Sequence, residues 1–227
     1  MNINLNKAHF PVTVLGPGRR IGIWLQGCRI GCNGCLSRDT WDATVNQTLP
    51  VARLLDWCER VSIQNAGLPD AAPPDGITIS GGEPFDQPDA LAALLDGLHA
   101  WRNRLKSDLD ILCYSGYPYT RLQSQHGSIL GRLDAVIPEP FIDSSPTRQL
   151  WRGSDNQTLQ LLTERARTKY APYVNATGSA QPGKQIQAML DGEKVWYIGI
   201  PQRGDMSTLE QRCKELGVHF HHPSWRP

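Results

Sequence analysis

The sequence has no long apolar run, and its first residues, MNINLNKAHFPV, lack the basic stretch and apolar core of a secretory signal. It also lacks an excess of either charge, because 23 Lys and Arg residues and 22 Asp and Glu residues leave a net charge of +1. We therefore expect no membrane partner, no nucleic-acid partner and a cytoplasmic location. A chain of 227 residues is long enough for one well-cored domain with a small addition.

Cysteine is scarce, with 6 residues, and only part of this set is clustered. The segment GCRIGCNGC holds Cys28, Cys32 and Cys35 with the spacing C-x3-C-x2-C. A disulfide framework is not expected in a reducing cytosol, so the cluster indicates metal ligands. The remaining cysteines are scattered and are expected to pack as small apolar side chains: Cys58, Cys113 and Cys213.

Short apolar segments alternate with amphipathic ones. The patterns predict strands at 20–26, 77–80, 110–114 and 133–137, and helices at 49–61, 89–105 and 120–130. The alternation predicts an α/β fold, a partial (β/α)-type barrel with mostly parallel strands. Ligands of such sheets bind beyond the carboxyl ends of the strands. The candidate motifs at Cys28, Ser80-Gly81-Gly82 and Ser115-Gly116 each directly follow a predicted strand.

The composition predicts three regions. Residues 1–162 form the core, and residues 163–183 form a linker or loop because 168–183 are rich in Gly, Pro, Ala, Thr and Ser. Residues 184–227 are expected to form a small C-terminal β-hairpin and helix appendage. Its hairpin turns at Asp191-Gly192, and Ser207-x-x-Glu210 predicts a capping box for a helix that ends near Gly217.

The cysteine loop suits one metal centre. Gly31 and Gly34 allow the loop to fold tightly, so that its thiolates can converge. A structural zinc ion normally takes four ligands, whereas an iron–sulfur cube held by three cysteines leaves one iron open. The lack of a fourth nearby cysteine favours the cube. A zinc site completed by Cys58 or a histidine is the alternative.

These motifs resemble the radical S-adenosylmethionine superfamily, whose signature is C-x3-C-x2-C after a strand. CNGC followed by Asp39-Thr40-Trp41 resembles the activating proteins of anaerobic ribonucleotide reductases. The similarity continues in SGGEP at 80–84, YSGY at 114–117 and WRGSDNQ at 151–157. Each motif alone is weak, but their shared order is specific.

The resemblance implies two cofactors. Cys28, Cys32 and Cys35 would hold a 4Fe-4S cluster. S-adenosyl-L-methionine would be bound by residues of three loops: Gly34, Leu36, Ser80, Gly81, Gly82, Glu83 and Ser115. Three simpler interpretations stay open: an ordinary turn at Gly81-Gly82, a solvated carboxylate at Glu83 and a turn-capping hydroxyl at Ser115. No acid–base residue is nominated, since the cofactor supplies the chemistry.

The implied activity is reductive cleavage of S-adenosylmethionine to a 5′-deoxyadenosyl radical. That radical would generate a glycyl radical on a partner enzyme such as anaerobic ribonucleotide reductase, with a flavodoxin or ferredoxin-type reductant. The small size predicts a site open at one side, which suits a protein substrate. The alternatives are a radical enzyme that modifies a peptide or small substrate, and a non-catalytic iron–sulfur or zinc interaction module.

The chain departs from the family in three ways. Glu83 stands where the family often has Asp, which is a mild change, and residues 168–183 have no counterpart in the family. The appendage extends beyond the compact family length, and this added unit leaves the identity of the partner open. Two groups of side chains have a simple and a functional interpretation. Trp41, Trp151 and Arg152 are either buried or partner-facing, and the histidines near the end are expected to be ordinary surface residues: His219, His221 and His222.

Overall fold

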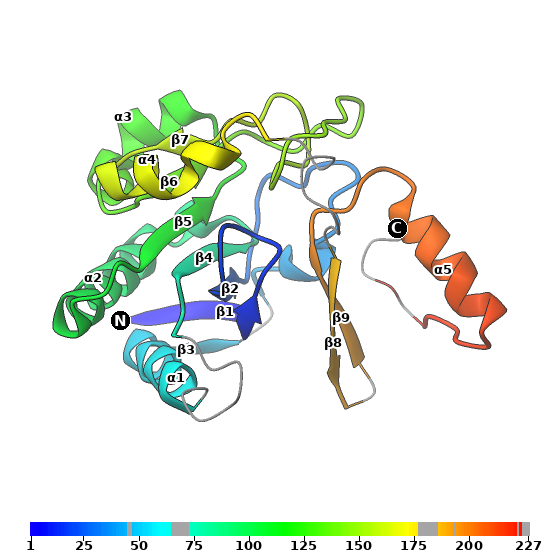
Figure 1. Cartoon of the computed structure of the whole chain (residues 1–227), viewed down its shortest axis with the longest axis horizontal. Coiled ribbons are helices and arrows are strands. Elements are labelled where there is room, and N and C mark those ends of the chain that lie inside the picture. The colour runs from blue at the N-terminus through cyan, green and yellow to red at the C-terminus, as the bar shows by residue number, and fades with distance from the viewer. Residues whose placement is uncertain (45–46, 65–72, 177–185, 193, 222, 224–227) are drawn as a thin grey trace.

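The structure is a computed structural model that describes residues 1–44, 47–64, 73–176, 186–192, 194–221 and 223. Its centre is a seven-stranded sheet in the order β3-β1-β2-β4-β5-β6-β7 (Figure 1). The strands are β1 Asn2–Val12, β2 Arg20–Leu25, β3 Thr48–Pro50, β4 Gly76–Gly81, β5 Asp110–Tyr114, β6 Ala135–Ile137 and β7 Gln160–Leu161. The helices among them are α1 Val51–Gln64, α2 Pro88–Leu105, α3 Tyr119–Leu130 and α4 Glu164–Tyr170.

The centre of the sheet is parallel, from β2 through β4 and β5 to β6. Its margins are antiparallel, because β1 pairs with β2 and β3 at one side and β7 pairs with β6 at the other. The expected α/β architecture with parallel central strands is confirmed. A barrel is not, since the described strands form an open sheet with β3 and β7 at its edges.

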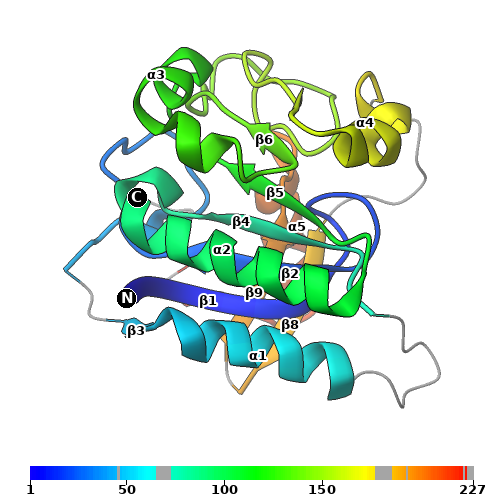
Figure 2. The same ribbon diagram turned by 90° about the vertical axis from the view of Figure 1, so that its left-hand side faces the viewer.

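One face of the sheet carries the main core. Strand residues such as Ile23, Ile79 and Ile111 are fully buried there. Figure 2 shows α1 and α2 lying side by side across this face, with α3 beyond them. Helix α2 contributes a row of leucines that includes Leu91 and Leu95. Every residue of β2 is buried, which is typical of a central parallel strand covered on both faces.

The opposite face of the sheet is covered by the chain after β6. Residues 163–183 were expected to be a linker or loop, but they contain α4 and a 3-10 turn, Ala171–Tyr173. Two contacts stabilise this helix. At its start, the hydroxyl of Thr163 accepts a hydrogen bond from the Ala166 N–H, and at its end Tyr170 is fully buried against Trp151. Residues 177–183 of this expected linker lie outside the described residues.

The C-terminal unit is a hairpin and a helix, as expected. Strands β8 (Ile186–Asp191) and β9 (Lys194–Gly199) are antiparallel, and α5 spans Asp205–Glu215. The expected capping box at Ser207 is wrong. The N-cap is Gly204, three residues earlier, and its φ of 92° is readily adopted by glycine.

Among the helices of the described residues, none combines the length and apolarity needed to cross a bilayer.

Candidate functional site

The cysteine loop begins where β2 ends and is fixed at its base by backbone hydrogen bonds. The Gly27 N–H donates to the Thr40 carbonyl at 2.7 Å, and the Cys28 N–H donates to the Trp41 carbonyl at 3.0 Å. Within the loop, Gly31 and Gly34 have φ values of 63° and 76°, which favour glycine. These two glycines bend the chain between the cysteines, as the sequence predicted.

The loop thiols differ from the buried cysteines. Cys28, Cys32 and Cys35 are all half-buried. Cys58 and Cys113 are fully buried in the main core, which confirms their expected packing role. Cys213, expected to pack in the same way, is half-buried on α5.

Burial raises the pKa of the Cys28 and Cys32 thiols, and the negative charge of Cys35 raises both further. Backbone N–H groups oppose this increase, from Gly31 at Cys28 and from Phe141 at Cys32. The thiols thus lie near enough to affect one another's charge. A cation between them would favour the thiolate forms.

The proposed fourth ligand of a zinc site does not reach the cysteine loop. Within the part of the chain that the structure describes, no group of three or more His, Cys, Asp or Glu side chains, the loop cysteines included, is gathered round a single point as one metal ion would require. Cys58, the proposed fourth zinc ligand, lies on α1 and is fully buried in the main core. A 4Fe-4S cluster instead takes one thiolate for each of three separate irons, and the loop supplies three thiols at one cavity.

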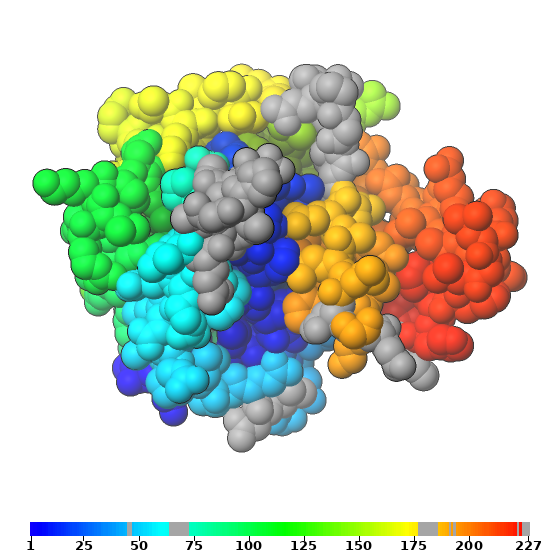
Figure 3. Space-filling model, turned by 60° about the horizontal axis from the view of Figure 1, so that its bottom comes forward, coloured from blue at the N-terminus to red at the C-terminus, as the bar shows by residue number. Residues whose placement is uncertain are grey.

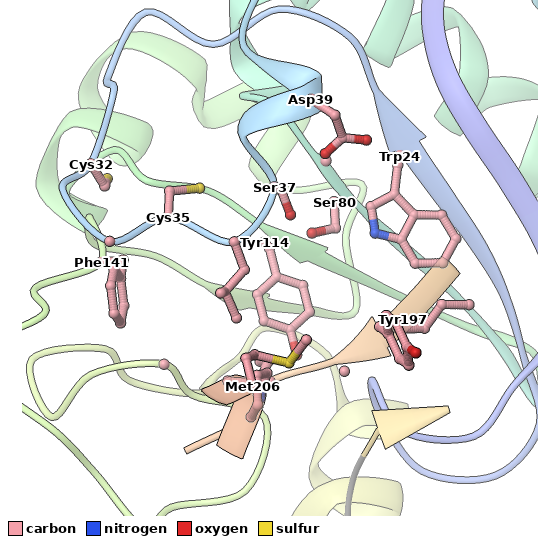
Figure 4. Close-up of a pocket in the computed structure, with 18 of the residues that line it drawn as sticks. Trp24, Cys32, Cys35, Ser37, Asp39, Ser80, Tyr114, Phe141, Tyr197 and Met206 are labelled. Carbon is pink, nitrogen blue, oxygen red and sulfur yellow. The ribbon is translucent and has the colours of Figure 1, made fainter. Parts of the chain in front are cut away.

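All residues predicted for the cluster and for S-adenosylmethionine line one cavity of about 1350 Å³. They are Cys28, Cys32, Cys35, Gly34, Leu36, Ser80, Gly81, Gly82, Glu83 and Ser115. Figure 4 shows Cys32 and Cys35 beside Phe141 at one end of the cavity, with Tyr197 at the other end. The structure therefore brings together residues that are up to 87 positions apart, from Cys28 to Ser115.

Gly81 and Gly82 bind the end of β4 to the cysteine loop. The Gly82 N–H donates to the Leu25 carbonyl and the Glu83 N–H to the Gly27 carbonyl, both at 2.8 Å. A Cβ atom on Gly82 would lie 2.0 Å from the Gly27 oxygen. This close approach of two backbone segments requires glycine at position 82, before any ligand is considered.

Glu83 is 1% exposed, so its interpretation as a solvated loop carboxylate is wrong. Its Oε1 accepts hydrogen bonds from the Phe85 N–H at 3.0 Å and the Ser115 hydroxyl at 2.9 Å. Its Oε2 accepts one from the Gly116 N–H at 2.7 Å. Burial raises the pKa of Glu83 to about 7, although these hydrogen bonds lower it.

The Ser115 hydroxyl has two partners within the protein. It donates to Glu83 and accepts from the Tyr117 N–H at 3.1 Å. Both the turn after β5 and the Glu83 carboxylate are held by this one group. The predicted capping role is therefore present, and the hydroxyl also positions the carboxylate beside the cavity.

We predict that Glu83 makes stability depend on pH. Its pKa in the folded protein, about 7, exceeds the ordinary 4.5, so the folded state binds the proton more tightly than the unfolded state does. The resulting stabilisation is complete below the unfolded pKa and is lost as pH rises through 7. As pH rises from below 4.5 to above 7, we expect the free energy of unfolding of wild type to fall by at most about 3 kcal/mol relative to that of Glu83→Gln. Urea unfolding of the reduced, cluster-free protein measures this difference.

The control for this experiment is Glu164→Gln, because the Glu164 side chain is 83% exposed on α4. This variant should follow the wild-type pH profile. A profile of Glu83→Gln that runs parallel to wild type from pH 5 to pH 8 would contradict the assignment.

Sequence reasoning missed residues whose partners are distant in the chain. Asp86 accepts hydrogen bonds from the Arg29 N–H at 3.1 Å and the Tyr117 hydroxyl at 2.5 Å, which ties the cysteine loop to two other segments. Tyr114, which was not predicted for the site, also lines the cavity, as does Arg152, which the sequence left either buried or partner-facing. Their motifs, YSGY and WRGSDNQ, were the available signals.

The remaining open interpretations are decided by burial. Trp151 and Arg152 are 8% and 5% exposed, so both are buried in this structure, and Arg152 also lines the cavity. Trp41 is half-buried at the cavity, with the Arg38 guanidinium 5.1 Å from its ring. His219 and His221 are exposed, as expected of surface histidines. His222 lies outside the described residues.

An open α/β sheet whose first parallel strand leads into a loop with three cysteines indicates an iron–sulfur protein. The model of the family described as a 4Fe-4S single cluster domain matches residues 14–160, and the chain belongs to this family. Residues after 160 lie beyond the matched stretch.

The chain is also similar to individual activating proteins. The chain is 28% identical over 146 residues to the anaerobic ribonucleoside-triphosphate reductase-activating protein of Enterobacteria phage T4, which covers 64% of this chain and 86% of the relative. It is 29% identical over 158 residues to the protein of the same name from Vibrio cholerae, covering 68% and 96%. A pyruvate formate-lyase-activating enzyme from Listeria monocytogenes is 35% identical over 79 residues, covering 35% and 30%. The resemblance inferred from the motifs is confirmed.

Proposed function

We propose that this chain is a radical S-adenosylmethionine enzyme that generates a glycyl radical on a partner enzyme such as an anaerobic ribonucleotide reductase. The observation that carries the proposal is that three thiols and all seven residues expected around S-adenosylmethionine line one cavity. The names of the relatives add support, because these proteins activate an anaerobic ribonucleoside-triphosphate reductase.

Cys28, Cys32 and Cys35 would hold the cluster. When bound, the cluster would supply the electron for reductive cleavage of S-adenosylmethionine, and the radical so produced would act on a backbone glycine of the partner. Glu83 offers a carboxylate to the cationic amino group. Its position is fixed by Ser115 and by the Gly116 N–H. A flavodoxin or ferredoxin-type protein would supply the electron, in the cytoplasm.

The site is less open than the chain length suggested. The C-terminal unit lines the cavity through β9 and the segment that enters α5. A protein segment must therefore enter between this unit and the core. We infer that residues 186–221 belong to the substrate side of the enzyme, and that residues 1–162 form the cofactor core.

The test is anoxic reconstitution with iron and sulfide, followed by dithionite and S-adenosylmethionine. We expect about four irons per chain and release of 5′-deoxyadenosine. Addition of an anaerobic ribonucleotide reductase should then give an organic radical signal by electron paramagnetic resonance. A single zinc ion with no 5′-deoxyadenosine would instead support a non-catalytic module, and cleavage without a radical on the reductase would point to another substrate.

A further inference from the structure

The C-terminal unit is attached to the cavity by specific contacts. The side-chain amide of Gln187 on β8 donates to the Pro11 carbonyl at 2.7 Å and accepts from the Thr13 N–H at 3.1 Å. Ile198 on β9 is 4% exposed and packs in a cluster with Val12 and Trp24. Figure 3 shows the hairpin against the N-terminal segment. The unit is thus built onto the sheet as one wall of the cavity.

Acidic and basic side chains that line the cavity come mostly from different segments of the chain. The carboxylates come from the cysteine loop, the loop after β4 and the segment after β6: Asp39, Glu83, Glu139 and Asp143. Basic groups come from the C-terminal unit and the loop before β7: Arg148, Arg152, Lys194 and Arg203. Among the described residues of the unit, those that line the cavity include no carboxylate.

Within the described part of the chain, these four basic side chains have no acidic partner. Lys7, which also lines the cavity, pairs with Asp39 at 2.9 Å. None of the other four forms an ion pair with a described residue. The sulfonium and amino groups of S-adenosylmethionine suit the carboxylates. Its single carboxylate needs only one basic partner, so the other basic groups are left for a different, anionic ligand.

Two buried donors at the cavity point to the same kind of ligand. Arg152 is 5% exposed, and its NH2 group donates to the Val174 carbonyl at 3.0 Å. Its Nε is buried without a hydrogen-bond partner among the described residues, as is the hydroxyl of Tyr114. In Figure 4, Tyr114 extends from the end of β5 toward the side of the cavity where Met206 and Tyr197 lie. Buried donors are normally paired, so unpaired donors at a cavity indicate a missing acceptor.

We propose that Tyr114 and Arg152, together with Lys194 and Arg203 of the C-terminal unit, bind carboxylate side chains of the protein segment that carries the reactive residue. A carboxylate supplies acceptors for a phenol and a guanidinium, and a charged acceptor binds both more strongly than a neutral one. This inference rests on the proposed function, because it names the chemistry of that function's protein substrate. With a net charge of +1, the chain has no overall basic excess of the kind that nucleic-acid binding uses, so we take the anionic ligand to be an acidic peptide.

The test is fluorescence anisotropy of the reconstituted full chain under anoxic conditions. The probe is a short fluorescein-labelled peptide of alternating glycine and glutamate, and its reference is the same peptide with glutamine. We expect the acidic peptide to bind at least about tenfold more tightly at low salt and to lose this preference as salt rises. A labelled single-stranded oligonucleotide is the third probe, and tighter binding of it would overturn the proposal.

Two variants test whether these side chains bind the acidic peptide or only stabilise the fold. Lys194 and Arg203 are exposed, so Lys194→Gln/Arg203→Gln should fold normally and weaken acidic-peptide binding about fivefold. Tyr114→Phe removes only an unpaired hydroxyl, so it should weaken binding about threefold while thermal stability stays equal or rises. A purely structural role for Tyr114 predicts lower stability and unchanged binding.

The matched control is Arg53→Gln/Arg60→Gln, which removes the same charge from exposed positions on α1 that do not line the cavity. It should bind the acidic peptide like wild type. Equal binding of the two peptides, or equal losses in both double variants, would overturn the proposal. 5′-deoxyadenosine release is measured on the same preparations, so failure of peptide recognition and failure of the proposed radical chemistry are scored separately.

Discussion

Cys32→Ala is expected to abolish both cluster binding and cleavage of S-adenosylmethionine. Cys32 lines the cavity between Cys28 and Cys35 on a loop whose base is fixed by hydrogen bonds. Loss of an outer partner of a metal ligand already costs about 10–100-fold in affinity or activity, so loss of a ligand should cost at least about a hundredfold. Iron content, absorbance of the cluster and 5′-deoxyadenosine after dithionite addition measure the effect.

Cys213→Ala is the control for this variant. Cys213 is half-buried on α5, and it is not among the residues that line the cavity. It should retain full iron content and full product. Unchanged iron and product in Cys32→Ala, or an equal loss in both variants, would remove Cys32 from the ligand set.

The expectation that the site residues meet at one edge of the sheet could be made from the sequence because it depends only on where strands end. Cys28 and Ser115 follow parallel strands and Ser80 lies at the end of one, and parallel strands bring their carboxyl ends to one edge of a sheet. All three line the cavity. The positions of central strands such as β5, at Asp110–Tyr114, followed from continuous apolar runs bounded by turn residues.

The strand β1 and the short helix α4 could not be predicted from apolar runs. Strand β1, NINLNKAHFPV, mixes polar and apolar residues because it is antiparallel to β2 and partly exposed. Helix α4 has only 7 residues, and its burial depends on Trp151 and Asp110, which are distant in sequence. Such elements are stabilised by tertiary contacts more than by their own periodicity.

The burial of Glu83 could not be predicted from its neighbours in the sequence either. Its carboxylate is adjacent to turn residues in sequence, which suggests solvent exposure. Burial results from Ser115 and Gly116, which lie 32 and 33 positions later. The C-terminal unit raises a similar difficulty, since its hairpin was visible in the sequence but its contact with Pro11 and Thr13 was not.

Asp110→Asn is expected to destabilise the protein by about 3–5 kcal/mol, because it leaves the buried Arg20 charge without a counter-charge. Both side chains of this pair are fully buried, with Arg20 NH2 2.7 Å from Asp110 Oδ2. The same carboxylate accepts a hydrogen bond from the Tyr170 hydroxyl at 2.5 Å. Because Tyr170 packs on Trp151, the substitution should also loosen the segment that carries Arg152. Urea unfolding measures the loss of stability.

Asp108→Asn tests whether burial, and not the number of ion pairs, determines this cost. Asp108 lies two residues earlier, its side chain is 74% exposed, and it pairs with Arg165 at 2.9 Å and Lys169 at 3.6 Å. Exposed pairs contribute about 0–1 kcal/mol, so this variant should lose little. The Arg20 charge lowers the pKa of Asp110, so its advantage over Asn should shrink as pH falls below the ordinary 3.8. Equal losses in the two variants would show that the buried pair does not anchor the sheet.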